Sequence, residues 1–271
     1  MAARSASSLR PEVPTLEELV PPQDLLPHYA QRRSFMKAGD RFLEAAVSRG
    51  LEPHHRVLDI GCGVGRFAVA LAGYLDERGS YVGIDTHAPS IRLCRKYIGR
   101  KLDRFRFKRV PFGEAATLRF PIRSASFDFA FSNSLFTHLM PEIAENYLLE
   151  IGRVLRPKGR AFNTMFLLND DSVALLDANS STHEKTYPFG DGRARVKQPE
   201  RPQGWIAHQE GFIRSVHERA HLEIEPPIRY GAWPGREPTG PGFGEKDIVV
   251  AVRGRWGIPH LLRRGTQSRR V

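Results

Sequence analysis

The chain contains little cysteine and no long apolar run. Cys62 and Cys94 are the two cysteines among its 271 residues, so no disulfide framework is expected. No apolar run approaches the roughly 18–20 residues needed to span a bilayer, and the first residues lack the apolar core of a secretory signal. We therefore expect a cytoplasmic protein without a membrane span, because a reducing compartment suits unpaired cysteines.

Metal-ligand spacings and acidic residues are also scarce. His, Cys and Asp do not recur at the spacings of metal sites, so no metal is expected. The formal net charge is +11, and part of it lies in residues 253–271, which contain arginines and no acid. Such segments are usually solvated tails. We therefore do not expect a nucleic-acid partner.

Residues 57–66, V-L-D-I-G-C-G-V-G-R, combine a short apolar run with three alternate glycines. The apolar residues favour a buried strand, and a helical pattern begins at Val64. Glycine allows a sharp turn and a close approach of the backbone to a ligand, and the next helix offers free N–H groups at its start. The segment predicts a cradle for a nucleotide-type cofactor.

Asp85 ends a second apolar run, residues 80–85, twenty positions after Gly65. A carboxylate about 20 residues beyond a glycine turn can accept hydrogen bonds from both ribose hydroxyls. Taken alone, Asp85 is explained equally well as the N-cap of the next helix. Combined with the glycine turn, it favours ligand binding.

The glycine spacing distinguishes between cofactors. It is G-x-G-x-G, whereas dinucleotide-binding turns have G-x-G-x-x-G, and Asp59 stands two residues before it. An acid there repels a pyrophosphate and suits a cation. Residues 57–66 resemble the first motif of the class I S-adenosylmethionine-dependent methyltransferases, whose cofactor carries an ammonium and a sulfonium. Residues 127–133, F-D-F-A-F-S-N, and 151–159, I-G-R-V-L-R-P-K-G, resemble two later motifs of that family. The resemblance spans about residues 35–168.

The resemblance implies S-adenosylmethionine as the cofactor and assigns its contacts. Asp59, Gly61 and Gly63 would hold the methionine end, with Cys62 between them as a small residue that fills the tight bend rather than a reactive thiol. The remaining implied contacts are Asp85 on the ribose, Thr86 beside it, and Ser132 and Asn133 near the methyl-bearing sulfur.

One contact expected from the resemblance is displaced. Relatives often place an acid after the third strand, at the adenine amino group, whereas residues 110–114 here read V-P-F-G-E. Glu114 either takes this role from a shifted position or is an exposed acid. The sequence leaves both open.

His138 is the candidate catalytic base. It follows the fourth predicted strand, shortly before Pro141 opens a helix, which places it at the mouth of the cofactor cleft. An imidazole suits proton removal near neutral pH. The alternative is a histidine that packs against or caps the helix start. Side chains that could line an acceptor pocket, each explained as well or better by a structural role, are His183, Tyr187, Trp205, His208, Tyr230 and Trp233.

Strands alternate with helices, which predicts an α/β fold with a doubly wound, mostly parallel sheet. Strands are predicted near 56–60, 80–85, 105–110, 127–131, 160–168, 222–230 and 246–253, and helices near 35–47, 64–75, 89–101, 141–155 and 210–220. The resemblance implies a Rossmann-like sheet of seven strands in which the last two form an antiparallel hairpin.

Three regions are expected along the chain. Residues 1–30 are rich in proline and serine and are predicted to be a disordered extension, apart from a turn of helix at residues 16–20. Residues 31–255 would form the methyltransferase domain, with a lid or substrate-binding insertion at about 169–210. Residues 256–271 would be a basic, disordered tail.

The leading functional hypothesis is methyl transfer to an oxygen, or secondarily a nitrogen, of a small molecule, sugar or lipid-like metabolite. Methyltransferases of nucleobase or glutamine amines usually carry Asn/Asp-Pro-Pro-aromatic after the fourth strand, and residues 132–135 read S-N-S-L. The alternatives are an RNA or protein methyltransferase that uses the basic surface, and a non-catalytic partner subunit. The oligomeric state is open.

Overall fold

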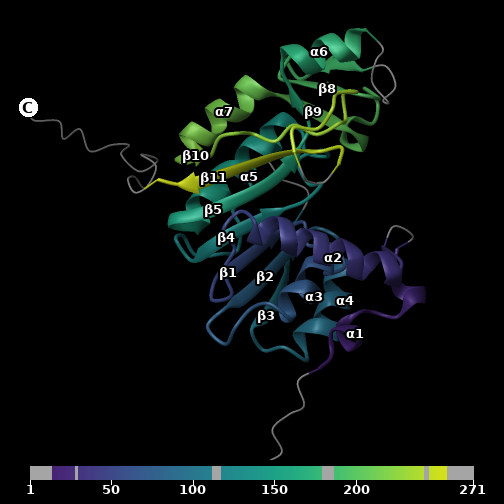
Figure 1. Ribbon diagram of the computed structural model, residues 1–271, viewed down its shortest axis with the longest axis vertical. Helices are drawn as coiled ribbons and strands as arrows, with labels where there is room; N and C mark the ends of the chain where they lie inside the picture. The colour runs from purple at the N-terminus through teal and green to yellow at the C-terminus, as the bar shows by residue number, and fades with distance from the viewer. Residues whose placement is uncertain (1–13, 28–29, 112–116, 179–185, 241–243, 255–271) are drawn as a thin grey trace, which may run out of the picture.

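A computed structural model describes residues 14–27, 30–111, 117–178, 186–240 and 244–254. Its main sheet has seven strands in the order β10-β11-β5-β4-β1-β2-β3, with helices on both faces (Figure 1). The strands are β1 (Arg56–Ile60), β2 (Ser80–Asp85), β3 (Phe105–Arg109), β4 (Phe127–Ser132), β5 (Leu155–Met165), β10 (Leu222–Ile224) and β11 (Asp247–Arg253). The helices are α1 (Leu16–Leu19), α2 (Arg32–Val47), α3 (Arg66–Ala72), α4 (Ala88–Cys94), α5 (Pro141–Val154), α6 (Asp170–Asp177) and α7 (Glu210–Arg219).

The strand directions confirm the predicted fold class. The strands β1 to β5 pair in parallel, whereas β11 runs antiparallel to both β5 and β10. The carboxyl ends of the parallel strands therefore meet at one edge of the sheet, which is where α/β sheets bind ligands. We call this the cofactor edge.

Alternation along the strands builds two cores. Val57 faces the core formed with α2, α3 and α4, whereas Leu58 and Ile60 face the core formed with α5 and α7. In β4, Phe129 and Ala130 divide in the same way. A strand that is buried on both faces reads as a continuous apolar run, which is why the sequence revealed these strands clearly.

Some element boundaries differ from the prediction. The strand predicted near 160–168 is β5, which begins earlier, at Leu155, and its pairing with β4 shifts between Phe127 and Phe129. The predicted strand at 222–230 ends at Ile224. The predicted helix at 89–101 consists of α4 followed by a π-helical turn, η3 (Arg95–Gly99).

The predicted turn of helix at residues 16–20 is confirmed as α1, whereas the disorder predicted around it is wrong for the rest of residues 14–27. This segment contains α1 and the 3-10 turn η1 (Gln23–Leu25), and Leu19, Val20 and Leu26 are buried in the first core. Thr15 and Glu18 form a reciprocal capping box at the start of α1. Apolar residues are few in this mostly polar segment, so its sequence did not indicate that it packs on the core. Residues 1–13 and 255–271, which include the predicted basic tail, lie outside the described residues.

The insertion at about 169–210 has regular structure of its own. A second sheet of order β6-β9-β8-β7 is built from β6 (Leu167–Leu168), β7 (Tyr187–Phe189), β8 (Ala194–Val196) and β9 (Ile206–Gln209), with η4 (Pro202–Gly204) before β9. Together with α6 it lies at the top of the molecule in Figure 1. Strands of two to four residues are too short for a visible alternation, so the sequence indicated an insertion but not its strands.

Asp247 ties this insertion to the main sheet. The residue is fully buried at the start of β11, and its carboxylate accepts from the Leu167 amide at 2.6 Å, the Gly231 amide at 2.7 Å and the Trp233 indole at 2.8 Å. Trp233 also packs with Phe166 and Trp205 in a separate aromatic cluster. Its role is thus the structural alternative considered above. Among the described residues, no helix is long and apolar enough to cross a membrane.

Candidate functional site

The glycine turn after β1 closes onto the end of β2. The amides of Gly61 and Cys62 both donate to the Ile84 carbonyl oxygen, at 2.8 and 3.1 Å. Gly61, Gly63 and Gly65 have φ angles of 77°, 53° and 86°, a region that glycine enters without steric cost. A Cβ on Gly63 would meet no atom within 4 Å, whereas one on Gly65 would lie 2.7 Å from the Ile98 side chain. The turn is therefore packed behind Gly65 and open in front of Gly63.

Asp85 connects this turn to the next one. Its Oδ2 accepts from the Gly63 amide and its Oδ1 from the His87 amide, each at 2.8 Å. Each carboxylate oxygen has a further lone pair, so the group can still accept from a ligand hydroxyl. The N-cap residue of α4 is His87 rather than Asp85, which removes the simple capping explanation.

Asp59 lies behind the turn, with 3% of its surface exposed. Its Oδ2 accepts from the Tyr81 hydroxyl at 2.7 Å. Burial raises the pKa of this carboxyl to about 7, because a low-dielectric surrounding disfavours the charged form. A cationic ligand group beside it would restore the ionised state.

Cys62 packs on the sheet side of the turn. A Cβ on Gly83 would lie 2.9 Å from its sulfur, so the two residues fit only because one is glycine. The Cys94 thiol lies 3.4 Å from the Gly63 carbonyl oxygen. A hydrogen bond with Cys94, together with burial, raises the pKa of the Cys62 thiol. Cys62 thus stays a neutral thiol, which agrees with its interpretation as a packing residue.

A small pocket of about 60 Å³ lies beside the turn at the cofactor edge. Its walls are Ile60, Gly61, Ile84, Asp85, Thr86, Val110, Leu135 and Tyr147. Ligand pockets are commonly about 300 Å³ or larger, so a whole cofactor would also extend over the open surface in front of Gly63. Apart from Asp85, Thr86 and Tyr147, the side chains that line the pocket are apolar, which suits the flat face of a base next to a ribose.

Ser132 and Asn133 are turned toward β5 rather than toward this pocket. The fully buried Ser132 hydroxyl donates to Asn163 Oδ1 at 2.8 Å. Asn133 Oδ1 accepts from the Thr164 hydroxyl at 3.2 Å. The residue that covers the turn is instead Leu135, whose side chain would lie 3.3 Å from a Cβ on Gly61. Glu114 and His183 lie outside the described residues.

The insertion holds the segment that carries His138. Its backbone pairs with that segment through the Ile206 amide, which donates to the Thr137 carbonyl oxygen at 2.9 Å. The Nε2 atom of His208 lies 3.0 Å from the Phe136 carbonyl oxygen, and burial lowers the His208 pKa to about 4, so this ring is a neutral donor. His208 is therefore structural.

The exposed His138 ring has a fixed orientation. Its Nδ1 lies 2.8 Å from the Gln203 carbonyl oxygen, in η4. A carbonyl oxygen only accepts, so Nδ1 carries the proton in the neutral ring, and Nε2 is left as a hydrogen-bond acceptor. This is the protonation pattern that a general base requires.

Five of the eight residues that line the pocket were not predicted as site residues, namely Ile60, Ile84, Val110, Leu135 and Tyr147. Val110 and Leu135 follow the ends of β3 and β4, a position that could have marked them, because ligands bind where parallel strands end. Tyr147 lies on α5 with the spacing of a core residue, so no sequence signal separated it from packing. Tyr230, in contrast, donates to Glu210 rather than lining this pocket. Tyr187 is exposed in β7.

Only one group of potential metal ligands occurs in the part of the chain that the structure describes. It consists of Glu52, His54 and His55, whose ligand atoms lie within 4.8 Å of one another. It precedes β1, at the edge opposite the glycine turn, and His55 Nδ1 already accepts from the Glu52 amide at 3.1 Å. It is therefore separate from the candidate site.

The buried Asp59 predicts a pH-dependent stability. Its folded-state pKa of about 7 exceeds the ordinary value of about 3.9, so its favourable contribution is present below pH 4 and is lost as the pH rises through 7. Asp59→Asn keeps an acceptor for Tyr81 but cannot ionise. We expect the variant to be more stable than the wild type by roughly 2–4 kcal/mol at pH 8, and by much less at pH 4.5.

Urea denaturation of both proteins at the two pH values measures this difference. Asp76→Asn, which changes a surface carboxylate bonded to Arg78, is the control and should show no gain at pH 8. An equal gap between Asp59→Asn and wild type at both pH values would contradict the assignment.

Comparison with known proteins agrees with this geometry. Residues 57–159 match the family model described as a methyltransferase domain. The O-methyltransferase cnsE of Penicillium expansum is 31% identical over 123 residues, which cover 45% of this chain and 42% of that protein. An uncharacterised methyltransferase of Bacillus subtilis, YcgJ, is 27% identical over 200 residues, covering 72% of this chain and 70% of that one. The match to cnsE thus spans less than half of that protein's length.

The fold also occurs in solved structures. A crystal structure of a SAM-dependent methyltransferase from Methanosarcina mazei aligns with a TM-score of 0.53 at 21% identity, covering 77% of this chain and 97% of that chain. The segment matched by the methyltransferase family model, residues 57–159, includes the glycine turn, Asp85 and the end of the strand before His138. Residues 57–159 are thus similar to a methyltransferase domain, and the fold of the chain is the Rossmann-like fold of the class I methyltransferases.

Proposed function

We propose that this chain transfers the methyl group of S-adenosylmethionine to an oxygen atom of a small molecule, with His138 as the base. The observation that carries the proposal is the cofactor edge itself. An open glycine turn, a carboxylate clamp and an apolar pocket meet there, and an imidazole with an accepting Nε2 lies on the segment that follows β4.

The residues present fit the cofactor. Asp59 and the turn at Gly61 and Gly63 would hold its ammonium end, because a buried carboxyl with a raised pKa is stabilised in its charged form by a cation. Asp85 would accept from the ribose hydroxyls, with Thr86 beside it. Leu135 and Val110 would pack on the base. Ser132 and Asn133 would act by fixing β4 against β5.

When bound, the cofactor supplies an electrophilic methyl group on a good leaving group. The protein then has to hold an acceptor in line with that group and remove one proton. His138 Nε2 would take the proton from the acceptor hydroxyl, while the Gln203 carbonyl oxygen holds Nδ1–H and steadies the resulting imidazolium. An oxygen acceptor needs such a base, because a neutral hydroxyl is a weak nucleophile.

The choice of a small oxygen acceptor rests on two further observations. The relative from Penicillium expansum carries the name O-methyltransferase. The residues after β4, S-N-S-L, lack the Asn/Asp-Pro-Pro-aromatic pattern associated with amine acceptors of nucleobases. We further propose that the insertion contributes the acceptor-binding surface, because Gln203 and Ile206 bond directly to the His138 segment.

Asp85 also holds the glycine turn, so its contact with the ribose has to be tested separately. Two ligands that differ only in a ribose hydroxyl make this possible. Wild type and Asp85→Asn are titrated calorimetrically with S-adenosylhomocysteine and with its 2′-deoxy analogue. We expect the wild type to bind the deoxy analogue roughly 10-fold or more weakly, since a hydrogen bond to a charged group is worth about 1.5–3 kcal/mol. Asp85→Asn should bind both ligands weakly and discriminate less between them.

The control for this cycle is Gly63→Ala, which perturbs the turn and leaves the carboxylate in place. It should weaken both ligands while keeping the wild-type ratio between them. Full discrimination by Asp85→Asn would exclude Asp85 as the ribose contact.

The role of His138 is tested by turnover. A panel of phenols, sugars and hydroxylated lipids is screened for release of S-adenosylhomocysteine, and the best acceptor is used for kinetics. His138→Ala should lower kcat by about 10²- to 10⁴-fold, the usual contribution of a general base, and leave S-adenosylmethionine affinity unchanged. His54→Ala, at the opposite edge of the sheet, should match wild type. A wild-type kcat in the His138→Ala variant would contradict the role of His138 as the base.

A further inference from the structure

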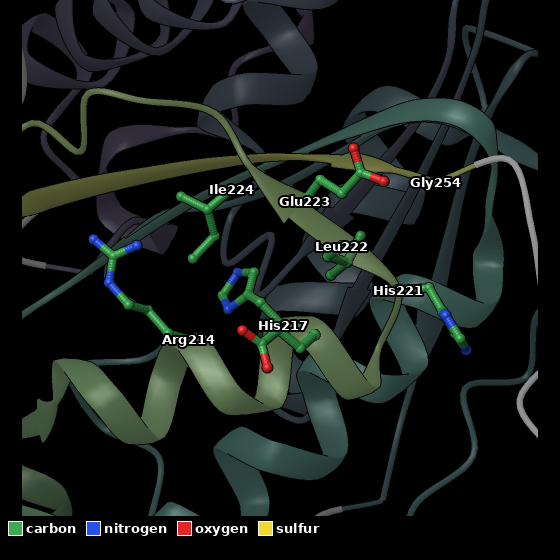
Figure 2. Close-up of a pocket in the computed structure, with 8 residues that line it drawn as sticks. Arg214, His217, His221, Leu222, Glu223, Ile224 and Gly254 are labelled. Atoms are coloured by element: carbon green, nitrogen blue, oxygen red, sulfur yellow. The ribbon is translucent and has the colours of Figure 1, made fainter.

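A pocket of about 510 Å³ lies between α7 and β10 (Figure 2), at the edge of the sheet opposite the cofactor edge. Its polar side chains do not converge on one point. Leu222 and Ile224 pack in the core formed with α5 and α7, so Glu223 between them points to the other face of β10, away from His217 (Figure 2). One small ligand could not contact both groups, so the size of this pocket gives it no ligand chemistry.

The small pocket at the cofactor edge, in contrast, contains a polar group that the protein leaves without a partner. Tyr147 lines this pocket together with Asp85, Val110 and Leu135, and 4% of its surface is exposed. Its hydroxyl forms no hydrogen bond with the residues that the structure describes. The oxygen is nevertheless accessible to solvent, unlike the enclosed Nε2 atom of His217. We therefore expect the Tyr147 hydroxyl to open into the pocket.

The ring of Tyr147 is held in place by its neighbours. It packs edge-on against Phe120, with the ring centroids 5.1 Å apart and an interplanar angle of 84°. The Phe120 amide donates to Glu150 Oε2 at 2.7 Å, and Arg153 donates to the same carboxylate at 2.6 Å. These contacts fix the hydroxyl before a ligand binds, which reduces the entropic cost of using it.

The hydroxyl stays protonated at neutral pH. Burial and the Asp85 carboxylate raise the pKa of Tyr147 above its ordinary value, because both disfavour the phenolate. A neutral phenol both donates and accepts hydrogen bonds. It can therefore pair with a ligand edge that presents an N–H donor beside a ring acceptor, as the amino group and the adjacent ring nitrogens of adenine do.

The other walls of the pocket leave this role to Tyr147. Asp85 holds both turns and is the proposed ribose contact, and Thr86 follows it directly in the chain. Most of the remaining walls are apolar side chains. The volume of about 60 Å³ admits the edge of a base rather than a whole base. An amino group that entered this space without an acceptor would lose its hydrogen bonds to water, which is costly.

We propose that Tyr147 recognises the base of S-adenosylmethionine, with its hydroxyl accepting a hydrogen bond from the 6-amino group of adenine. This inference rests on the cofactor site of the proposed function and does not depend on His138 or on the methyl acceptor. A purine without the amino group leaves the hydroxyl unpaired, so the contact makes the site select adenine.

The test uses two ligands and one oxygen atom. Wild type and Tyr147→Phe are titrated calorimetrically with S-adenosylhomocysteine and with its purine analogue, in which hydrogen replaces the 6-amino group. We expect the wild type to bind S-adenosylhomocysteine roughly tenfold more tightly than the analogue. Tyr147→Phe should bind S-adenosylhomocysteine roughly tenfold more weakly than the wild type does and should bind the analogue with unchanged affinity.

The matched control is Tyr97→Phe, which removes a hydroxyl in η3, outside the pocket. It should keep the wild-type affinity for both ligands. Urea denaturation without ligand is the second readout. Because the Tyr147 hydroxyl has no partner among the described residues, Tyr147→Phe should be at least as stable as the wild type.

Three results would overturn the base contact while leaving the cofactor site in place. They are equal binding of the two ligands by the wild type, full discrimination between them by Tyr147→Phe, and a loss of stability in ligand-free Tyr147→Phe, which would give the hydroxyl a partner within the protein. Failure of the wild type to bind S-adenosylhomocysteine at all would overturn the cofactor site and this inference together.

Discussion

The Asp85 carboxylate is the constraint on which the cofactor edge depends. By accepting the Gly63 and His87 amides it fixes the turns after β1 and β2 relative to each other. The Ile84 carbonyl oxygen adds two bonds to the same turn. These hydrogen bonds fix the backbone of both turns before any ligand binds, which reduces the entropic cost of ordering the site on binding. Residues on two adjacent strands act here as one rigid unit.

The insertion applies a similar constraint on the other side of the site. Backbone and imidazole hydrogen bonds from residues 203–208 hold the segment 136–138, and Asp247 anchors the insertion to the main sheet. Most of these contacts use backbone carbonyl oxygens. They can therefore persist through many changes of side chain in the insertion, so the His138 ring can keep its orientation while the exposed surface of the insertion varies.

The sequence predicted the frame of this protein better than its details. Buried strands and the glycine turn are local signals, so β1, β2 and β4 and the position of Asp85 were predictable. The insertion was not, because its strands are short and its stability comes from contacts distant in sequence, such as Leu167 with Asp247. The sequence also could not predict the direction of individual side chains. Ser132 and Leu135 both lie at the end of β4, yet Ser132 faces Asn163 and Leu135 covers the glycine turn.

The central claim is that the glycine turn and Asp85 form a site for S-adenosylmethionine. Calorimetric titration of the purified protein with S-adenosylmethionine, S-adenosylhomocysteine and NADH tests it most directly. The account predicts micromolar binding of the first two ligands and no binding of NADH. Binding of NADH alone would indicate a dehydrogenase-type site and contradict the account. Binding of none of the three would contradict the proposal that this chain by itself holds the cofactor.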